Sequence, residues 1–326
     1  MLASIIMIVI GFGLLVAGGE VLVRGAVQLA ERLKVSTFVI GAVIIGFGSS
    51  TPELVTSIEA GLLGVPGIAL GNIVGSNILN ILVVIGIAAM IAPITVGADH
   101  VRLDTVIVCA LTAAFVGLCA LLQLTPAIGA ALLVVLTAYL VYAIRREVGV
   151  DPAVATPTEN QAAPLAAVAQ AAPQPSASGA DAWTIALVLA GLGTLIFGGH
   201  LVVSAAVSLA GQLGISEAII GLTIVALGTS LPEIVTAVVA AVRRRPDVAL
   251  GNVLGSCVFN LLAIGGAVAI ISPADVPPEI QRFDNVVMLA AALLLLAAVS
   301  FARQIGRLAG ALFLGSYAAY LTAIWP

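Results

Sequence analysis

Charged residues are scarce in this sequence, and their scarcity limits what the protein can be. Of 326 residues only 9% are charged, whereas 61% are hydrophobic. Soluble domains contain about 25% charged and about 45–50% apolar residues, so the composition excludes a water-soluble enzyme. The 12 Lys and Arg residues are scattered along the chain. Because a nucleic-acid-binding surface needs clustered positive charge, nucleic acid is excluded as a partner.

Cysteine and histidine are rarer still, with three and two residues. Cys109, Cys119 and Cys257 lie in apolar runs without the CxxC spacing of zinc sites, and we expect them to be buried free thiols. His100 and His200 are isolated in the sequence and suggest no metal site. No spacing is typical of a nucleophile and its base, so the sequence predicts neither an enzyme nor a bound cofactor.

The hydrophobic residues gather in long runs, and the mean hydropathy of the chain is +1.24. A transmembrane helix needs about 20 mostly apolar residues. Ten runs meet this length, near residues 2–31, 36–62, 67–93, 103–121, 125–144, 183–212, 216–242, 247–272, 283–302 and 305–325. The sequence therefore predicts an all-α integral membrane protein with ten transmembrane helices in a lipid bilayer.

Basic residues orient these runs. Arg145 and Arg146 follow the fifth run and Arg243–Arg245 follow the seventh, whereas the connections at 61–67 and 122–126 carry no basic residue. Cytoplasmic loops carry an excess of Lys and Arg. We therefore expect a multi-pass protein of the cell (inner) membrane with both termini outside.

Residues 147–182 separate two halves, 1–146 and 183–326. This segment is rich in Ala, Pro, Gln and Ser and lacks aromatic residues. Because such a segment cannot bury enough apolar surface to fold alone, we expect a flexible cytoplasmic linker.

The two halves repeat each other in sequence. Residues 46–86 align without a gap on residues 226–266, and 17 of the 41 positions are identical. Each half contains five apolar runs, an odd number, so the second copy must enter the membrane in the opposite orientation. The sequence thus predicts two inverted-topology five-helix repeats, a design typical of secondary transporters that bind substrate near the midplane.

Two glutamates, Glu53 and Glu233, lie in the middle of apolar runs at matching positions of the repeat. A charge at this depth costs at least about 2.5–3.5 kcal/mol, so it indicates a functional site; a protonated, hydrogen-bonded structural glutamate is the alternative. Pro52 and Pro232 precede them and release backbone carbonyls from helical hydrogen bonding. Carboxylates, hydroxyls and carbonyls are the oxygen ligands that hard cations prefer.

Polar side chains accompany both glutamates and recur in the run that follows each. The first set contains Ser49, Ser50, Thr56 and Ser57 with Glu53, and Thr229, Ser230 and Thr236 with Glu233. The second set contains Asn72, Ser76 and Asn80, and Asn252, Ser256 and Asn260. A spacing of four places each triplet on one helix face. Ion binding and interhelical hydrogen bonding both remain open for Asn72 and Asn252; for the other four residues of the second set we favour ion binding.

The remaining acidic residues are weaker candidates. Asp104 and Asp284 lie near the ends of runs beside Arg102 and Arg282, and we expect them at the membrane interface. Glu59 lies on a different helix face from the central glutamates, near the outer end of its run.

The doubled segments G-[ST]-S-x-P-E and G-N-x-x-G-S-x-x-x-N resemble the alpha repeats of the cation/calcium exchanger superfamily, and most closely those of its prokaryotic sodium/calcium exchangers. The resemblance covers essentially the whole chain outside the linker. It implies a ten-helix fold with four ion sites at its centre, and Ca²⁺ and Na⁺ as the transported ions.

The resemblance also implies which residues bind these ions. Glu53 and Glu233 would form the calcium site with carbonyls or hydroxyls of Ser49 and Thr229. The residues implied in sodium binding are Ser50, Ser230, Ser76 and Ser256, with the carbonyls of Gly46 and Ala226. Asn80 and Asn260 would complete the central layer. Several exchangers carry Asp at the position of Asn260, and the Asn found here leaves the ion stoichiometry open.

The expected function is sodium/calcium antiport by alternating access. Two carboxylates are neutralised by one Ca²⁺ or by two Na⁺, so the ions compete for shared ligands. The first and sixth runs would slide against the core that holds the ligands. The alternative is a proton/calcium exchanger on the same fold, with Glu53 or Glu233 carrying the proton. A cation channel is disfavoured because two buried acids in an inverted repeat suit a closed, alternating site better.

Overall fold

The computed structural model describes residues 2–32, 49–96, 99–121, 123–148, 180–214, 216–242, 246–273, 275–302 and 304–324. These residues are almost entirely helical. The elements of the first half are α1 (Leu2–Arg32), α4 (Thr51–Leu62), α5 (Pro66–Leu79), η2 (Asn80–Val84), α6 (Ile85–Ile91), β1 (Ile94–Thr95), α7 (Asp99–Leu121) and α8 (Pro126–Val148).

The second half contains a similar series. Its elements are α10 (Ala180–Leu213), α11 (Glu217–Ile220), η3 (Gly221–Val225), α12 (Ala226–Thr229), α13 (Leu231–Val242), α14 (Pro246–Phe259), η4 (Asn260–Ile264), α15 (Gly265–Ile271), η5 (Ile280–Asp284), α16 (Asn285–Phe301), β2 (Gln304–Ile305) and α17 (Arg307–Ile324). The expected linker falls mostly on residues 149–179, which lie outside the described residues.

Seven helical stretches among the described residues are long and apolar enough to cross a membrane. They are Pro66–Ile91, Val101–Leu121, Pro126–Ala143, Ala182–Gln212, Ala249–Ile271, Ile280–Phe301 and Arg307–Ile324. Leu2–Gly18 and Ala218–Thr229 are shorter apolar helices. The chain therefore has an all-helical membrane fold. Much of the second predicted run lies within residues 33–48, outside the described residues.

The core is formed by the two interrupted helices α5–η2–α6 and α14–η4–α15. Their spans are 89% and 78% buried, against 17% for Arg307–Ile324. In each, a short π-helical segment begins at an asparagine, at Asn80 and at Asn260, which are equivalent positions of the repeat. Because π-helical turns are rare and often occur at functional sites, their recurrence makes Asn80 and Asn260 candidate site residues.

Helix contacts recur between the halves. α6 packs on α17, where Gly86 and Gly310 approach closely, and α15 packs on α8, where Gly266 and Gly129 do the same. The ribbon β1–β2 is antiparallel and pairs Ile94 with Ile305. Each half thus completes its packing with the last helix of the other half.

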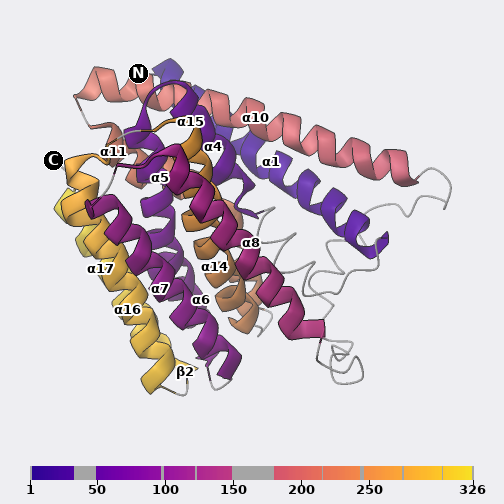
Figure 1. Ribbon diagram of the computed structural model, residues 1–326, viewed down its shortest axis with the longest axis vertical. Helices are drawn as coiled ribbons and strands as arrows, with labels where there is room; N and C mark the ends of the chain where they lie inside the picture. The colour runs from indigo at the N-terminus through magenta and orange to yellow at the C-terminus, as the bar shows by residue number, and fades with distance from the viewer. Residues whose placement is uncertain are drawn as a thin grey trace.

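The long helices α1 and α10 lie side by side along one flank of the remaining helices (Figure 1). Gly11 of α1 lies against Gly198 of α10. Gly18, about two turns further along α1, lies against Gly191. Because residue numbers rise along one helix as they fall along the other, the two helices are antiparallel. Glycines at these positions are required, since a Cβ on Gly11 or Gly18 would come within about 3 Å of the partner backbone.

Candidate functional site

The backbone is interrupted at the same place in both halves. Ser50 and Ser230 have similar non-helical dihedral angles, with φ of −90° and −85° and ψ of 8° and 9°. Each directly precedes a helix with proline at its second residue, α4 or α13. The sequence predicted this break, because proline cannot continue the preceding helical hydrogen bonding. It places Glu53 and Glu233 in the first turns of α4 and α13.

Both glutamates are buried, with exposed fractions of 1% for Glu53 and 0% for Glu233. Each accepts a hydrogen bond from the opposite half. The Ser230 hydroxyl donates to Oε1 of Glu53 at 2.8 Å, and the Ser50 hydroxyl donates to Oε1 of Glu233 at 3.2 Å. Since the two bonds join equivalent residues, the halves meet symmetrically at the glutamates.

The other residues predicted for this site are also buried, apart from Gly46, which lies outside the described residues. Ser49 lies beside the Glu233 carboxylate, and Thr229 beside that of Glu53. The Ser256 hydroxyl donates to Oε1 of Glu233 at 3.3 Å. The structure thus gathers hydroxyl groups from the segments that precede α4 and α13 and from α14 around the two carboxylates.

Several polar atoms at this centre lack a hydrogen-bond partner among the described residues. They are Oε2 of Glu53, Oε2 of Glu233, and both side-chain polar atoms of Asn80 and Asn260. A buried polar group without a partner costs about 1–3 kcal/mol, so such a concentration of them indicates that a ligand supplies the missing interactions. Carboxylate and amide oxygens together suit a hard cation.

Asn72 has a scaffold role. Its amide nitrogen donates to the Glu53 carbonyl at 3.2 Å and to the Ser57 hydroxyl at 2.9 Å. Its amide oxygen accepts from the Thr229 hydroxyl at 3.1 Å and from the Ser76 hydroxyl at 3.5 Å. With these four bonds made, interhelical hydrogen bonding describes Asn72 better than ion binding. Ser76 is therefore directed to Asn72 rather than to a glutamate.

The structure gives two residues partners that the sequence did not indicate. Nδ1 of His200 lies 2.6 Å from Oε1 of Glu59 on α4. Asp284 is 2% exposed and accepts a hydrogen bond of 2.9 Å from the Tyr320 hydroxyl. Both partners are more than 30 residues away in sequence, so no local pattern could have identified them.

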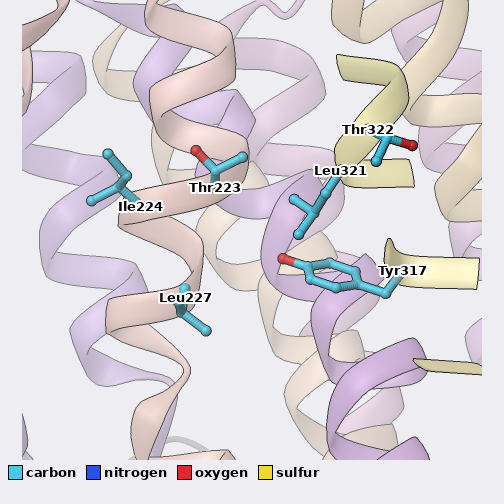
Figure 2. A pocket seen from close by; sticks show the side chains of 6 residues that line it. All are labelled: Thr223, Ile224, Leu227, Tyr317, Leu321 and Thr322. Atoms are coloured by element: carbon cyan, nitrogen blue, oxygen red, sulfur yellow. The ribbon is translucent and has the colours of Figure 1, made fainter. Parts of the chain in front are cut away.

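A cavity of about 590 Å³ lies between η3–α12 and α17. Figure 2 shows its lining, which consists of Thr223, Ile224, Leu227, Tyr317, Leu321 and Thr322. None of these described lining residues is a predicted ion ligand or carries a charge.

Comparison with known proteins agrees with the geometry. A family described as "Sodium/calcium exchanger protein" matches residues 3–145 and 183–325. The chain is 35% identical over 328 residues to the putative antiporter CaxA of Alkalimonas amylolytica, covering 98% of each chain. It is 29% identical over 368 residues to the sodium/calcium exchanger MaX1 of Methanosarcina acetivorans, covering 99% of this chain and 98% of that protein.

A solved structure is also similar. The sodium-calcium exchanger NCX_Mj, soaked with 10 mM Na⁺ and 10 mM Sr²⁺, matches with a TM-score of 0.67 and 26% identity. The match covers 100% of this chain and 99% of that one. The likeness therefore extends over both halves and the packing between them.

Proposed function

Because the chain belongs to the sodium/calcium exchanger protein family, which matches both of its halves, we propose that it exchanges Na⁺ for Ca²⁺ across the cell (inner) membrane. Membership of this family makes it a membrane transporter of the cation/calcium antiporter class. The centre of the molecule supports the binding of cations. There each glutamate has one oxygen bonded to a serine of the other half and one oxygen without a partner among the described residues.

Charge balance explains why such a centre would exchange ions. Two buried carboxylates are costly unless they are paired with positive charge. One Ca²⁺ or two Na⁺ supply that charge, and both would use the same oxygens. A loaded centre can be occluded at little cost, whereas an empty one would bury two uncompensated charges. The carrier would therefore cross between its two states with an ion bound, which is exchange rather than one-way leakage.

The binding set follows from the same centre. Glu53 and Glu233, with Ser49 and Thr229, would hold Ca²⁺. The hydroxyls of Ser50, Ser230, Ser76 and Ser256, with the carbonyls of Gly46 and Ala226, would hold Na⁺, with Asn80 and Asn260 between them. The unpartnered amide atoms of Asn80 and Asn260 support this assignment for the central layer.

We further propose that 1–146 and 183–326 form two inverted five-helix repeats, giving ten spans with both termini outside and the linker 147–182 in the cytoplasm. The antiparallel course of α1 and α10 supports inversion. The start of α1 and the end of α17 lie at the same end of the molecule (Figure 1). In this arrangement α1 and α10 would slide against the core to open the site alternately to each side.

Flux measurements in proteoliposomes test the proposal. We expect an outward Na⁺ gradient to drive ⁴⁵Ca²⁺ uptake, because the two ions share one set of ligands. Uptake driven by a pH gradient and indifferent to Na⁺ would instead identify a proton/calcium exchanger with Glu53 or Glu233 as the proton carrier. Calcium flux that needs no counter-ion would identify a channel.

A further inference from the structure

One polar contact joins the long helix pair to a helix of the ion site. His200 on α10 and Glu59 on α4 lie with Nδ1 and Oε1 2.6 Å apart, and an ionised carboxylate accepts this hydrogen bond. Glu59 is about 1.7 helical turns beyond Glu53 on the same helix. The side chains are 51% and 20% exposed for His200 and Glu59. The bond therefore holds α10 against the helix that carries a central glutamate.

The repeat contains no equivalent of this contact. The residues 180 positions away from His200 and Glu59 are Glu20 and Val239. Valine has no polar side-chain atom, so this second pair cannot form the hydrogen bond. The contact belongs to only one of the two equivalent interfaces.

A second contact of the long helices involves residue types that the repeat does not conserve. A Cβ on Gly228 would overlap the ring of Phe12, so the ring lies directly on the backbone of α12 beside Thr229. The equivalent residues are Gly48 and Leu192. The aromatic ring of this contact is therefore present in one half of the sequence and replaced by leucine in the other.

One contact between α10 and α4 has the same residue types at the equivalent positions of the repeat. A Cβ on Gly199 of α10 would lie 2.8 Å from Cγ1 of Val55 on α4. The equivalent residues, Gly19 and Val235, are of the same types. The repeat therefore conserves the residue types of this contact, whereas it does not conserve those of the His200–Glu59 and Phe12–Gly228 contacts.

Resting on the proposed exchange cycle, we infer that His200 and Glu59 are positioning residues that favour the described conformation over its inverted counterpart. In an inverted repeat the two end states exchange the conformations of the two halves. If both halves can form a contact, one copy of it is then present in each end state. If only one half can form the contact, it is present in the described state and lost in the other. A contact made in one state alone shifts the populations toward that state. For a partly exposed pair the shift is up to about fivefold.

The test measures calcium affinity from each face of the membrane. In vesicles sorted by orientation, the half-saturating Ca²⁺ concentration for Na⁺-driven exchange is determined on both faces. We expect His200→Ala to raise this concentration on one face and lower it on the other, each by up to about fivefold. Glu59→Gln should shift both values in the same directions, and the double variant should add little, because the two residues act through one bond.

Ser208→Ala is the matched control. Ser208 accepts a hydrogen bond of 3.4 Å from Ser4, within the α1–α10 pair. Loss of this hydrogen bond should leave both half-saturating concentrations unchanged, because Ser4 on α1 and Ser208 on α10 would move together in the exchange cycle. If His200→Ala leaves the half-saturating Ca²⁺ concentration unchanged on both faces, or shifts it in the same direction on both, the inference is overturned. Absence of exchange in the unmodified protein would instead contradict the proposed function, so the two failures are distinguishable.

Discussion

Asn72 and Asn252 occupy equivalent positions in the two halves, yet their surroundings differ. Asn72 makes four hydrogen bonds that join α4, α5 and α12. Both polar atoms of the Asn252 side chain are without a partner among the described residues. An identical motif residue is therefore part of the scaffold in one half, whereas in the other half it has no hydrogen-bond partner among the residues that the structure describes.

The difference arises from the neighbours of the motif. Ser57, a partner of Asn72, is replaced by Ala237 at the equivalent position. Ser76 donates to Asn72, whereas its equivalent Ser256 donates to a glutamate. A repeated motif thus conserves residue types, but its hydrogen bonds depend on residues outside the motif.

The largest expected effect concerns the feature that the halves share. Glu53→Gln and Glu233→Gln should each lower Na⁺-driven ⁴⁵Ca²⁺ uptake at least about 100-fold, because removing one member of a buried charge group costs about 3 kcal/mol or more. Glu59→Gln, on the same helix as Glu53, is the control and should stay within about fivefold of the unmodified rate.

Calcium should also raise the Tm of the unmodified protein but not that of the Glu53→Gln and Glu233→Gln variants. Full activity of the double variant would refute the site.

The next effect comes from the close contact of α1 with α12. Gly228→Ala should destabilise the protein by about 1–3 kcal/mol, since its Cβ would overlap the Phe12 ring. The expected readouts are a lower Tm in detergent and loss of exchange. Adding Phe12→Ala creates space for the new methyl group and should restore much of the stability. A Gly228→Ala protein with unchanged Tm would show that the ring does not occupy this position.

Alanine substitutions compare the two amides directly. Asn72→Ala should lower the Tm clearly more than Asn252→Ala, because it leaves buried partners of Asn72 unsatisfied at about 1–3 kcal/mol for each group. Thermal unfolding of both variants in one detergent measures the difference. Equal losses of stability would mean that the two amides have equivalent bonds after all.

The smallest expected effect would make the halves more alike. Ala237 is buried, and Ala237→Ser would place a hydroxyl where Ser57 stands in the other half. If it bonds to Asn252, the protein should gain about 0.5–1.5 kcal/mol of stability. Ser57→Ala, which removes the existing bond to Asn72, should lose a similar amount. A fall in Tm for Ala237→Ser would show that the second half has no room for this bond.

Much of the architecture could be predicted from local patterns. Hydrophobic runs identified the seven membrane-length helical stretches among the described residues, and the repeat placed Glu53 and Glu233 at equivalent positions, which the structure shows to be buried. Proline identified the backbone breaks before α4 and α13, because its missing N–H acts within one helical turn. The π-helical segments that begin at Asn80 and Asn260 were not predicted, since their backbone geometry depends on packing in the core.

Long-range partners were beyond such patterns. The pairs His200–Glu59 and Tyr320–Asp284 join residues 141 and 36 positions apart. A sequence states which residues can form hydrogen bonds but not which of them meet. For Asp284 the nearby Arg282 indicated a position at the membrane interface, and the structure adds a hydrogen bond from the Tyr320 hydroxyl that no local pattern indicated.

The sequence by itself determined that the chain lies in a membrane, that it is built twice, and that each copy carries a glutamate in the middle of an apolar run. These properties follow from hydrophobicity, covalent order and helical periodicity, which act over short distances. Only the tertiary structure decided that Ser50 and Ser230 bond to the glutamates of the opposite halves, and that Asn72 differs from Asn252. Those outcomes depend on how helices distant in sequence pack, because a hydrogen bond forms only where packing brings donor and acceptor within about 3 Å.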